Sequence, residues 1–157
     1  MVKILLDTTY LLPIFRIRVR LERYEEVFPQ LLEGYDVLYT PLSLVEAKWV
    51  VLSISRGSHS ERERYLEAFR RGLKALLHEE RLTQTIVTSP EIERVADVLL
   101  IKGGIKDYFD RMIYATATFY DAALLTEDER LARLVVEGAP RPREVLCWRD
   151  LLKMLVT

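Results

Sequence analysis

The chain has 157 residues, of which 50% are hydrophobic and 30% charged, and its net charge is −1 at pH 7. This length predicts one domain over residues 1–157, and the composition excludes disordered, collagen-like and disulfide-stapled proteins. Its apolar runs are shorter than the roughly 18 residues of a membrane-spanning helix. The apolar start meets Asp7 too early for a secretory signal, so we expect a cytoplasmic protein with no membrane partner.

Cysteine and histidine are too few to build a structural zinc site. Cys147 is the single cysteine, and His59 and His78 are the only histidines. The near-neutral charge argues against binding nucleic acid by bulk positive charge, although a bound metal can still attract phosphate. Asn is absent while Glu and Arg are abundant, a bias reported for heat-adapted proteins that predicts a thermophilic source.

The first half of the chain alternates short apolar runs with segments of helical spacing. In chain order the predicted elements are a strand at 2–6, helices at 8–15 and 21–33, a strand at 36–40, and helices at 41–56 and 60–78. Pro29 is interpreted as a break in the second of these helices, and Pro41 suits a first helical turn. Ser60 and Glu63 form a capping-box pattern at the start of the long charged helix.

The second half continues the alternation. The predicted elements are a strand at 85–88, helices at 89–103 and 107–120, a strand at 122–125, a helix at 127–137, a strand at 145–148 and a last helix. Ser89-Pro90 marks one helix start, and Gly103-Gly104 ends that helix. Strands that alternate with helices predict an α/β fold, with a parallel sheet covered on both faces.

Carboxylates stand where the predicted strands end. Asp7 ends the first strand, and Asp128 follows the fourth by three residues. In open α/β sheets, ligands bind beyond the carboxyl ends of the strands, near the point where the strand order reverses. Glu46 lies in an apolar helix and needs a partner such as a cation. Asp107 and Asp110 are three residues apart and therefore share one helix face.

Each acid also has a purely structural interpretation. Asp7 and Asp107 suit helix N-caps, and Asp110 suits a first helical turn, where it complements the helix dipole. Ser43-x-x-Glu46 fits a capping box. This interpretation is weaker for Asp128, because Thr126-x-x-Glu129 supplies a capping box that leaves Asp128 free.

Four segments together resemble the ordered motif set of the PIN-domain nucleases. They are Ile4-Leu-Leu-Asp7-Thr-Thr9-Tyr-Leu-Leu12, Ser43-Leu-Val-Glu46, Asp110-Arg-Met-Ile-Tyr-Ala-Thr-Ala117 and Leu124-Leu-Thr126-Glu-Asp128. The resemblance covers essentially the whole chain, and the final strand and helix at 145–155 also fit it. It implies a three-layer α/β/α fold around a mainly parallel sheet of about five strands.

The resemblance also implies which residues form the site. Four acids take the catalytic and metal-binding positions: Asp7, Glu46, Asp110 and Asp128. Thr9 and Thr126 stand at hydroxyl positions that assist the acids or a metal-bound water, and Asp107 stands where some members carry an additional acid. The chain departs from the family pattern at Asp121-Ala122, where a glycine-containing turn is more common, and at Glu127, where a small or amide residue is more common.

Carboxylates that meet in one pocket repel one another, and a divalent cation resolves that conflict. Ligands that are all oxygen suit Mg²⁺ or Mn²⁺ better than zinc. Such a metal would activate a water molecule in line with the scissile phosphodiester and offset charge on the phosphate oxygens. The resemblance implies endonucleolytic cleavage of an RNA substrate that leaves a 5′-phosphate.

Other residues are weaker candidates for contact with RNA. Candidates for phosphate contact are Arg16, Arg18, Arg20, Arg23 and Arg111. Candidates for stacking on bases are Tyr10, Tyr108 and Tyr114. A solvated charged face and core packing are the more common explanations for these two patterns.

Within the PIN family, the chain resembles VapC-like toxins, which form homodimers and are inhibited by a small antitoxin protein. Apolar residues 11–15 and 42–54 are candidates for a dimer surface, and core burial explains them equally well. The alternatives are an RNA-processing nuclease outside a toxin–antitoxin system and a non-catalytic PIN-like module that binds RNA or protein. A haloacid-dehalogenase-type phosphatase fits less well, because it needs a second acid where Thr9 stands.

Overall fold

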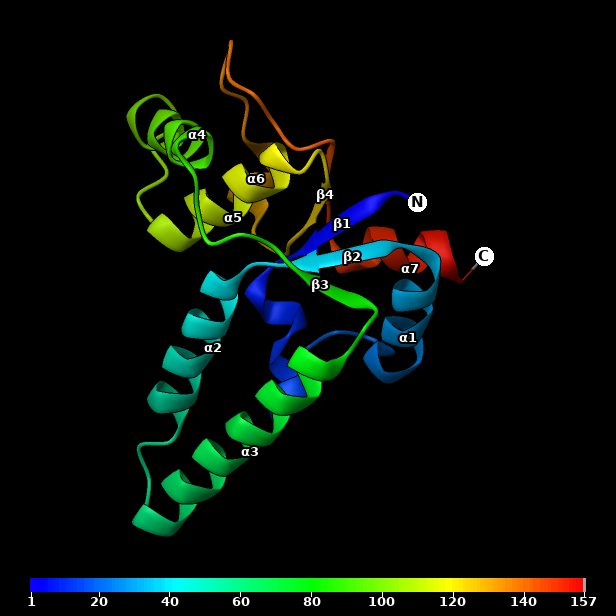
Figure 1. The fold of residues 1–157 in the computed structure, drawn as a ribbon, viewed down its shortest axis with the longest axis vertical. Helices are drawn as coiled ribbons and strands as arrows, with labels where there is room; N and C mark the ends of the chain where they lie inside the picture. Colours follow the sequence, from blue (N-terminus) through cyan, green and yellow to red (C-terminus); the bar gives the residue numbers. More distant parts are fainter. Residues whose placement is uncertain (157) are drawn as a thin grey trace.

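The computed structural model describes residues 1–156 and contains a five-stranded parallel sheet in the order β3-β2-β1-β4-β5 (Figure 1). The strands are β1 (Lys3–Leu6), β2 (Asp36–Tyr39), β3 (Leu82–Gln84), β4 (Ala123–Leu125) and β5 (Glu144–Leu146). The α-helices are α1 (Tyr24–Gly34), α2 (Pro41–Ile54), α3 (His59–His78), α4 (Pro90–Ile101), α5 (Tyr108–Phe119), α6 (Glu129–Arg133) and α7 (Trp148–Leu155). The predicted α/β fold with a parallel sheet is confirmed.

Alternating side chains of the strands build two separate cores, one on each face of the sheet. On β1, Ile4 and Leu6 join one buried cluster while Leu5 joins the other, and β2 and β4 repeat this alternation. The first cluster takes buried residues from α1, α2, α3 and α7, and the second from α4, α5 and α6. Strands buried on both faces explain why these segments read as continuous apolar runs.

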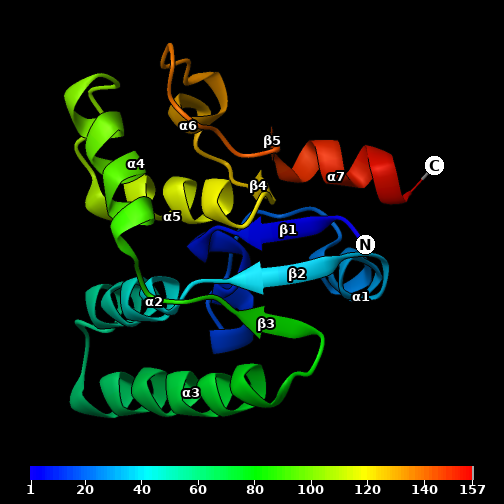
Figure 2. The same ribbon diagram turned by 45° about the horizontal axis from the view of Figure 1, so that its top comes forward.

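The order of the strands creates a switch point between β1 and β4. The chain runs from β1 outward to β2 and β3, and then returns to place β4 and β5 on the other side of β1. Figure 2 shows β1, β2 and β3 pointing the same way, with α2 beyond their arrowheads and α1 near their starts. Leu6 pairs with Leu125 across the switch point. The residues that follow these two strands therefore emerge side by side, where open α/β sheets bind ligands.

The predicted third strand at 85–88 is wrong by three residues. The strand is β3, at Leu82–Gln84, and its register places Leu82 opposite Val37 of β2. Ile86 and Val87, whose apolar character favoured the later position, are 45% and 51% exposed. Leu82 is instead the buried apolar residue that anchors the edge strand, so tertiary packing selects it over the more apolar neighbouring segment.

Three predicted helices differ from the observed elements. Residues 8–15 form two 3₁₀ turns, η1 (Thr8–Tyr10) and η2 (Leu12–Phe15), rather than one helix. Pro29 lies inside α1 without ending it, and it is exposed, so water can satisfy the carbonyl that its missing N–H leaves free. The predicted helix at 127–137 is reduced to α6, after which the chain turns through Gly138 at φ 76°.

The start of α3 also differs from the prediction. Ser58 is the N-cap, and its hydroxyl accepts a hydrogen bond from the Glu61 backbone N–H at 3.3 Å. The predicted capping box of Ser60 and Glu63 is therefore wrong by two residues. No helix within residues 1–156 is both long enough and apolar enough to cross a membrane.

Candidate functional site

Asp7 is fixed at the switch point by hydrogen bonds from both neighbouring segments. Its backbone N–H donates to the Leu125 carbonyl at 3.0 Å. Its Oδ1 accepts from the Thr8 backbone N–H and its Oδ2 from the Thr126 hydroxyl, both at 2.7 Å. Burial raises the pKa of Asp7, although the hydrogen bonds from Thr126 and Thr8 lower it. The carboxylate thus has one defined orientation at the end of β1.

Thr126 links the two acids that follow β1 and β4. It is 1% exposed, and its Oγ1 donates to Asp7 and accepts from the Asp128 backbone N–H at 3.1 Å. Asp128 is the N-cap of α6, with Oδ1 accepting from the backbone N–H groups of Arg130 and Leu131. The predicted capping box of Thr126 and Glu129 is therefore wrong, because the Thr126 hydroxyl serves Asp7 instead.

Replacing Thr126 with valine is expected to lower the free energy of unfolding by about 2 kcal/mol, because the change removes a buried hydrogen bond to a charged group. Serine at the same position keeps the hydroxyl and should retain most of that stability. Urea unfolding of the metal-free protein at pH 7 measures both variants. Equal stability of T126V and T126S would show that the hydroxyl contributes nothing.

Asp107 and Asp110 lie at the start of α5. The predicted N-cap is confirmed, since Asp107 Oδ1 accepts from the Asp110 backbone N–H at 3.0 Å. Asp110 occupies the first helical turn, as predicted, and its side chain is 19% exposed. Helix α5 packs against the sheet, so its N-terminus carries Asp110 towards the ends of β1 and β4.

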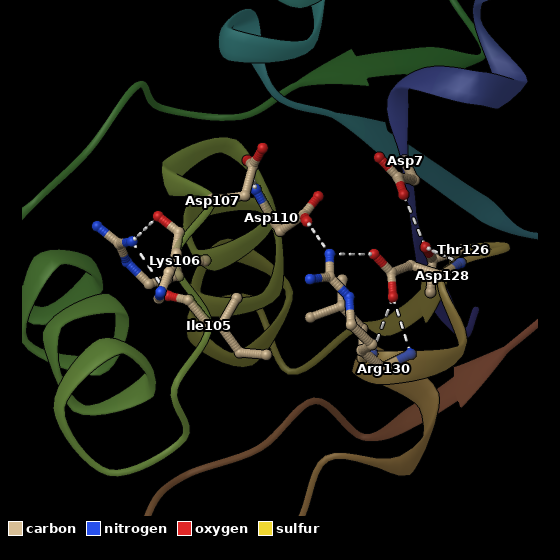
Figure 3. A network of polar contacts seen from close by, with 10 residues as sticks. Asp7, Ile105, Lys106, Asp107, Asp110, Thr126, Asp128 and Arg130 are labelled. Atoms are coloured by element: carbon tan, nitrogen blue, oxygen red, sulfur yellow. Dashed lines mark hydrogen bonds and ion pairs between the residues drawn. The ribbon is translucent and has the colours of Figure 1, made fainter.

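Arg130 lies between two of these acids, a contact that the sequence analysis did not predict. Its Nη2 is 3.2 Å from Asp110 Oδ2 and 3.2 Å from Asp128 Oδ2 (Figure 3). The two carboxylate oxygens can therefore be no farther apart than twice that distance. The signal in the sequence was an arginine two residues after Asp128, in the first turn of α6.

Glu46 lies on a different helix from Asp110, namely α2. Thr40 is the N-cap of this helix, and its hydroxyl accepts from the Leu42 backbone N–H at 3.3 Å. Ser43 lies buried inside the helix, so the predicted capping box of Ser43 and Glu46 is wrong. The half-buried Glu46 therefore has no capping role. The interpretation of this residue as part of a capping box is wrong.

Thr8, which the sequence did not single out, is the hydroxyl next to Glu46. The Thr8 hydroxyl is buried and makes no hydrogen bond of regular geometry, but its proximity lowers the pKa of Glu46. The half-buried Thr9 makes no side-chain hydrogen bond in the described part of the chain. Sequence reasoning missed Thr8, although it directly follows Asp7.

The negative charges of the acids raise the pKa values of their neighbours. Burial, followed by the charges of Asp107, Asp7, Asp128 and Glu46, raises the pKa of Asp110 to about 7. The pKa of Glu46 is also raised, by burial and then by the charges of Asp7 and Asp107, against the effect of Thr8. The four predicted acids and Asp107 therefore share one region of the molecule.

Asp128 behaves differently from its neighbours. Burial would raise its pKa, but the hydrogen bonds from the Arg130 side chain and from the backbone of Arg130 and Leu131 outweigh burial and lower it. The Arg130 guanidinium thus already supplies a positive charge that stabilises the ionised Asp128.

The candidate ligands are of the chemical type that a hard divalent cation prefers. Every candidate ligand is an oxygen, and three of the acids have pKa values raised by burial, the penalty that a bound cation relieves. Within residues 1–156, however, no three acidic, histidine or cysteine side chains converge closely enough to hold an ion as they stand. Coordination therefore requires these side chains to rotate towards one another.

Arg111 is not available to bind phosphate, contrary to one expectation. It is 8% exposed, and its Nη1 donates to the carbonyls of Ile105 and Lys106 at 3.1 and 2.6 Å (Figure 3). These carbonyls belong to the loop that leads into Asp107. Arg111 therefore holds the start of α5 in place.

The aromatic candidates are mostly core residues. Tyr10 and Tyr114 are 0% and 4% exposed, and Tyr10 stacks on Trp148. Neither ring can stack on a base. Tyr108 is 46% exposed, and its hydroxyl donates to Glu93 at 2.7 Å. The predicted arginines at 16, 18, 20 and 23 are all exposed.

Comparisons with known proteins agree with this architecture. The model of the PIN domain matches residues 4–137, whereas no curated protein matches the sequence. VapBC2 from Rickettsia felis, solved with a DNA fragment from its promoter, has a similar structure with a TM-score of 0.62, 17% identity, and coverage of 93% of this chain and 98% of that one. PAE2754 from Pyrobaculum aerophilum gives a TM-score of 0.56 at 16% identity, with coverage of 99% and 96%.

A third similar structure is that of VapBC-5 from Mycobacterium tuberculosis. It gives a TM-score of 0.55 at 20% identity, and the match covers 94% of this chain and 98% of that one. At such identities the solved structures show a shared fold. The PIN-domain match is of a different kind, because it spans most of the sequence, from β1 to beyond α6, and includes all five acids. The chain belongs to the PIN-domain family.

Proposed function

We propose that this protein is a metal-dependent endoribonuclease whose acids Asp7, Glu46, Asp110 and Asp128 bind Mg²⁺ or Mn²⁺. The observation that carries the proposal is the placement of Asp7, Asp110 and Asp128 at the switch point of the sheet, where Thr126 binds Asp7 and Arg130 bridges the other two acids. Such a concentration of like charge is costly to a fold and is typical of functional sites. Membership in the PIN-domain family supports the same chemistry.

The residues of the chain have distinct roles in this proposal. When bound, the metal would lower the pKa of a water molecule and offset charge on the phosphate. Asp7 is oriented by Thr126, and Asp110 is oriented by the cap that Asp107 provides. The pKa of Asp110 is near 7 without metal, and a bound cation would favour the charged carboxylate that serves as a ligand. Thr9 stays a secondary candidate for assisting the acids or a metal-bound water.

The proposed biological setting is a toxin–antitoxin pair. The resemblance to VapC-like toxins and the similar VapBC structures support an RNA substrate and a small antitoxin protein as partners. An RNA-processing nuclease outside such a pair would use the same chemistry. A phosphatase of the haloacid-dehalogenase type is rejected, because the PIN-domain model matches most of the chain.

A homodimer is part of the proposal, and α2 supports it. Val45, Trp49 and Leu52 follow one another at helical spacing and are 47%, 65% and 46% exposed. Such a row of apolar side chains is typical of a protein interface. The other predicted dimer segment, residues 11–15, packs into the core of the chain instead.

A non-catalytic PIN-like module is the second candidate, and one observation favours it. Asp7, Asp107 and Asp128 each act as a helix N-cap, so their presence has a structural explanation. Glu46 has no such role, which makes it the residue that separates the two candidates.

Replacing Glu46 with glutamine is expected to weaken Mn²⁺ binding by at least about tenfold, while the stability of the metal-free protein changes little. Mn²⁺ at a hundred times its Kd should stabilise the wild-type protein by about 2.7 kcal/mol, and E46Q should show less at the same concentration. Thermal unfolding with and without Mn²⁺ measures both effects, and cleavage of a 5′-labelled RNA tests the activity itself.

The matched control is E129Q, which removes the same charge from an exposed acid of α6 whose partner is Arg133. This control should bind Mn²⁺ as the wild-type protein does. If E46Q lost stability in the absence of metal but kept full Mn²⁺ binding and RNA cleavage, the proposed role of Glu46 would be wrong.

A further inference from the structure

Arg130 occupies the place between Asp110 and Asp128 at which a shared cation would bind. We propose that its guanidinium is an internal cation that holds the metal-free site together and competes with the divalent metal for these two acids. The inference rests on the proposed function in one respect, since it takes Asp110 and Asp128 to be metal ligands. It adds a residue that the PIN motifs do not include.

The geometry places a single nitrogen on both acids. Arg130 Nη2 lies 3.2 Å from Oδ2 of Asp110 and 3.2 Å from Oδ2 of Asp128. A metal shared by Asp110 and Asp128 would compete with Arg130 for these two carboxylates, at about 2.1 Å from its ligand oxygens. It would also stand within a few ångströms of the guanidinium, and two cations at that separation repel strongly. Metal and Arg130 therefore exclude each other.

Exposure indicates that Arg130 covers the acids from the solvent side. Its side chain is 65% exposed, whereas those of Asp110 and Asp128 are 19% and 22% exposed. The backbone N–H of Arg130 is also bound to Asp128 Oδ1, so the residue is anchored while its side chain folds back over the acids. An exposed side chain can leave without disturbing the core.

The acids of the site are the ionic partners of Arg130. Hydrogen bonding and attraction to Asp128, followed by attraction to Asp110 and Asp107, raise its pKa. Arg133, one turn later on α6, pairs with Glu129 in solvent instead, with both side chains at least 80% exposed. The placement of Arg130 is therefore specific to the site and is not a general property of arginines on this helix.

The competition also accounts for the lack of a preformed three-ligand arrangement in residues 1–156. Arg130 binds Asp110 and Asp128, while Asp7 is bound separately by Thr126. Once the guanidinium leaves, the two carboxylates lose their counterion and turn to the metal.

Titration of Mn²⁺ into the full chain, followed by calorimetry without RNA, tests the inference. R130A is expected to bind Mn²⁺ about four to twenty-five times more tightly than the wild-type protein, because an exposed ion pair changes an equilibrium constant by a factor of about two to five and Arg130 makes two. R130Q keeps more of the side chain and should show the same direction. R133A, which removes an equal charge from the same helix, should change the Kd by less than about twofold.

Thermal unfolding supplies a second measurement. R130A should lower the Tm of the metal-free protein, and this difference should vanish or reverse at saturating Mn²⁺. Unchanged or weaker Mn²⁺ binding in both R130A and R130Q would overturn the inference, as would an equal gain in R133A. If no variant bound Mn²⁺, the inference and the metal requirement would fail together. Tighter binding in a protein that cleaves no RNA would overturn the proposed function alone.

Discussion

Replacing Asp110 with asparagine is expected to reduce Mn²⁺-dependent RNA cleavage on the order of 10³-fold or more while the fold is retained, because the change removes a proposed metal ligand and its negative charge. Asparagine keeps the shape of the side chain, and the Asp110 backbone N–H remains bound to Asp107. Replacing Asp7 with asparagine should have a similar effect, since its oriented carboxylate lies at the switch point. Single-turnover cleavage of a labelled RNA measures the rates, and circular dichroism checks the fold.

A suitable control is D121N. Asp121 is an exposed acid that pairs with Arg143 at 3.6 Å, and its backbone has φ 51°, a conformation that asparagine tolerates well. This variant should cleave RNA at the wild-type rate. Wild-type rates in both D110N and D7N would reject the proposed roles of these acids, whatever the state of the fold.

The contribution of Asp110 to the stability of the metal-free protein should fall as the pH rises from about 4 to about 7. Its pKa is about 7 in the folded protein against an ordinary value of 3.8. Between these two values the folded state binds a proton that the unfolded state has lost, so the free energy of unfolding decreases with pH and then levels off. The shift corresponds to at most about 4 kcal/mol, and solvent and the relaxation of neighbouring groups reduce the expected effect to about 2 kcal/mol.

The comparison of wild-type protein with D110N isolates this contribution, because the other titrating groups are common to both. D110N should gain stability relative to wild type as the pH rises, and be more stable by about 2 kcal/mol at pH 8 without metal. Urea unfolding at pH 4.5, 6, 7 and 8 in the presence of a chelator measures the difference. A difference that does not change with pH would show that burial and the surrounding acids leave Asp110 unperturbed.

The sequence determined the architecture and the identity of the acids. Apolar runs of strand length alternate with helical segments, and this pattern has one simple solution, a parallel sheet with helices on both faces. Asp7 follows β1 directly and Asp128 comes three residues after β4, so their positions along the chain already place them at one edge of the sheet. Local sequence located the end of β1 and the start of α5, whereas tertiary packing placed β3 three residues before its predicted position.

The tertiary structure alone decided how these groups are used. Thr126 appeared to cap α6, yet its hydroxyl binds Asp7, because the pairing of β1 with β4 brings together residues 119 positions apart. In the same way, the Arg130 guanidinium reaches Asp110 only because the folded chain brings the first turns of α5 and α6 together at the switch point. A hydroxyl or a guanidinium takes the acceptor that packing places beside it, and for these two residues that acceptor lies on a distant segment of the chain.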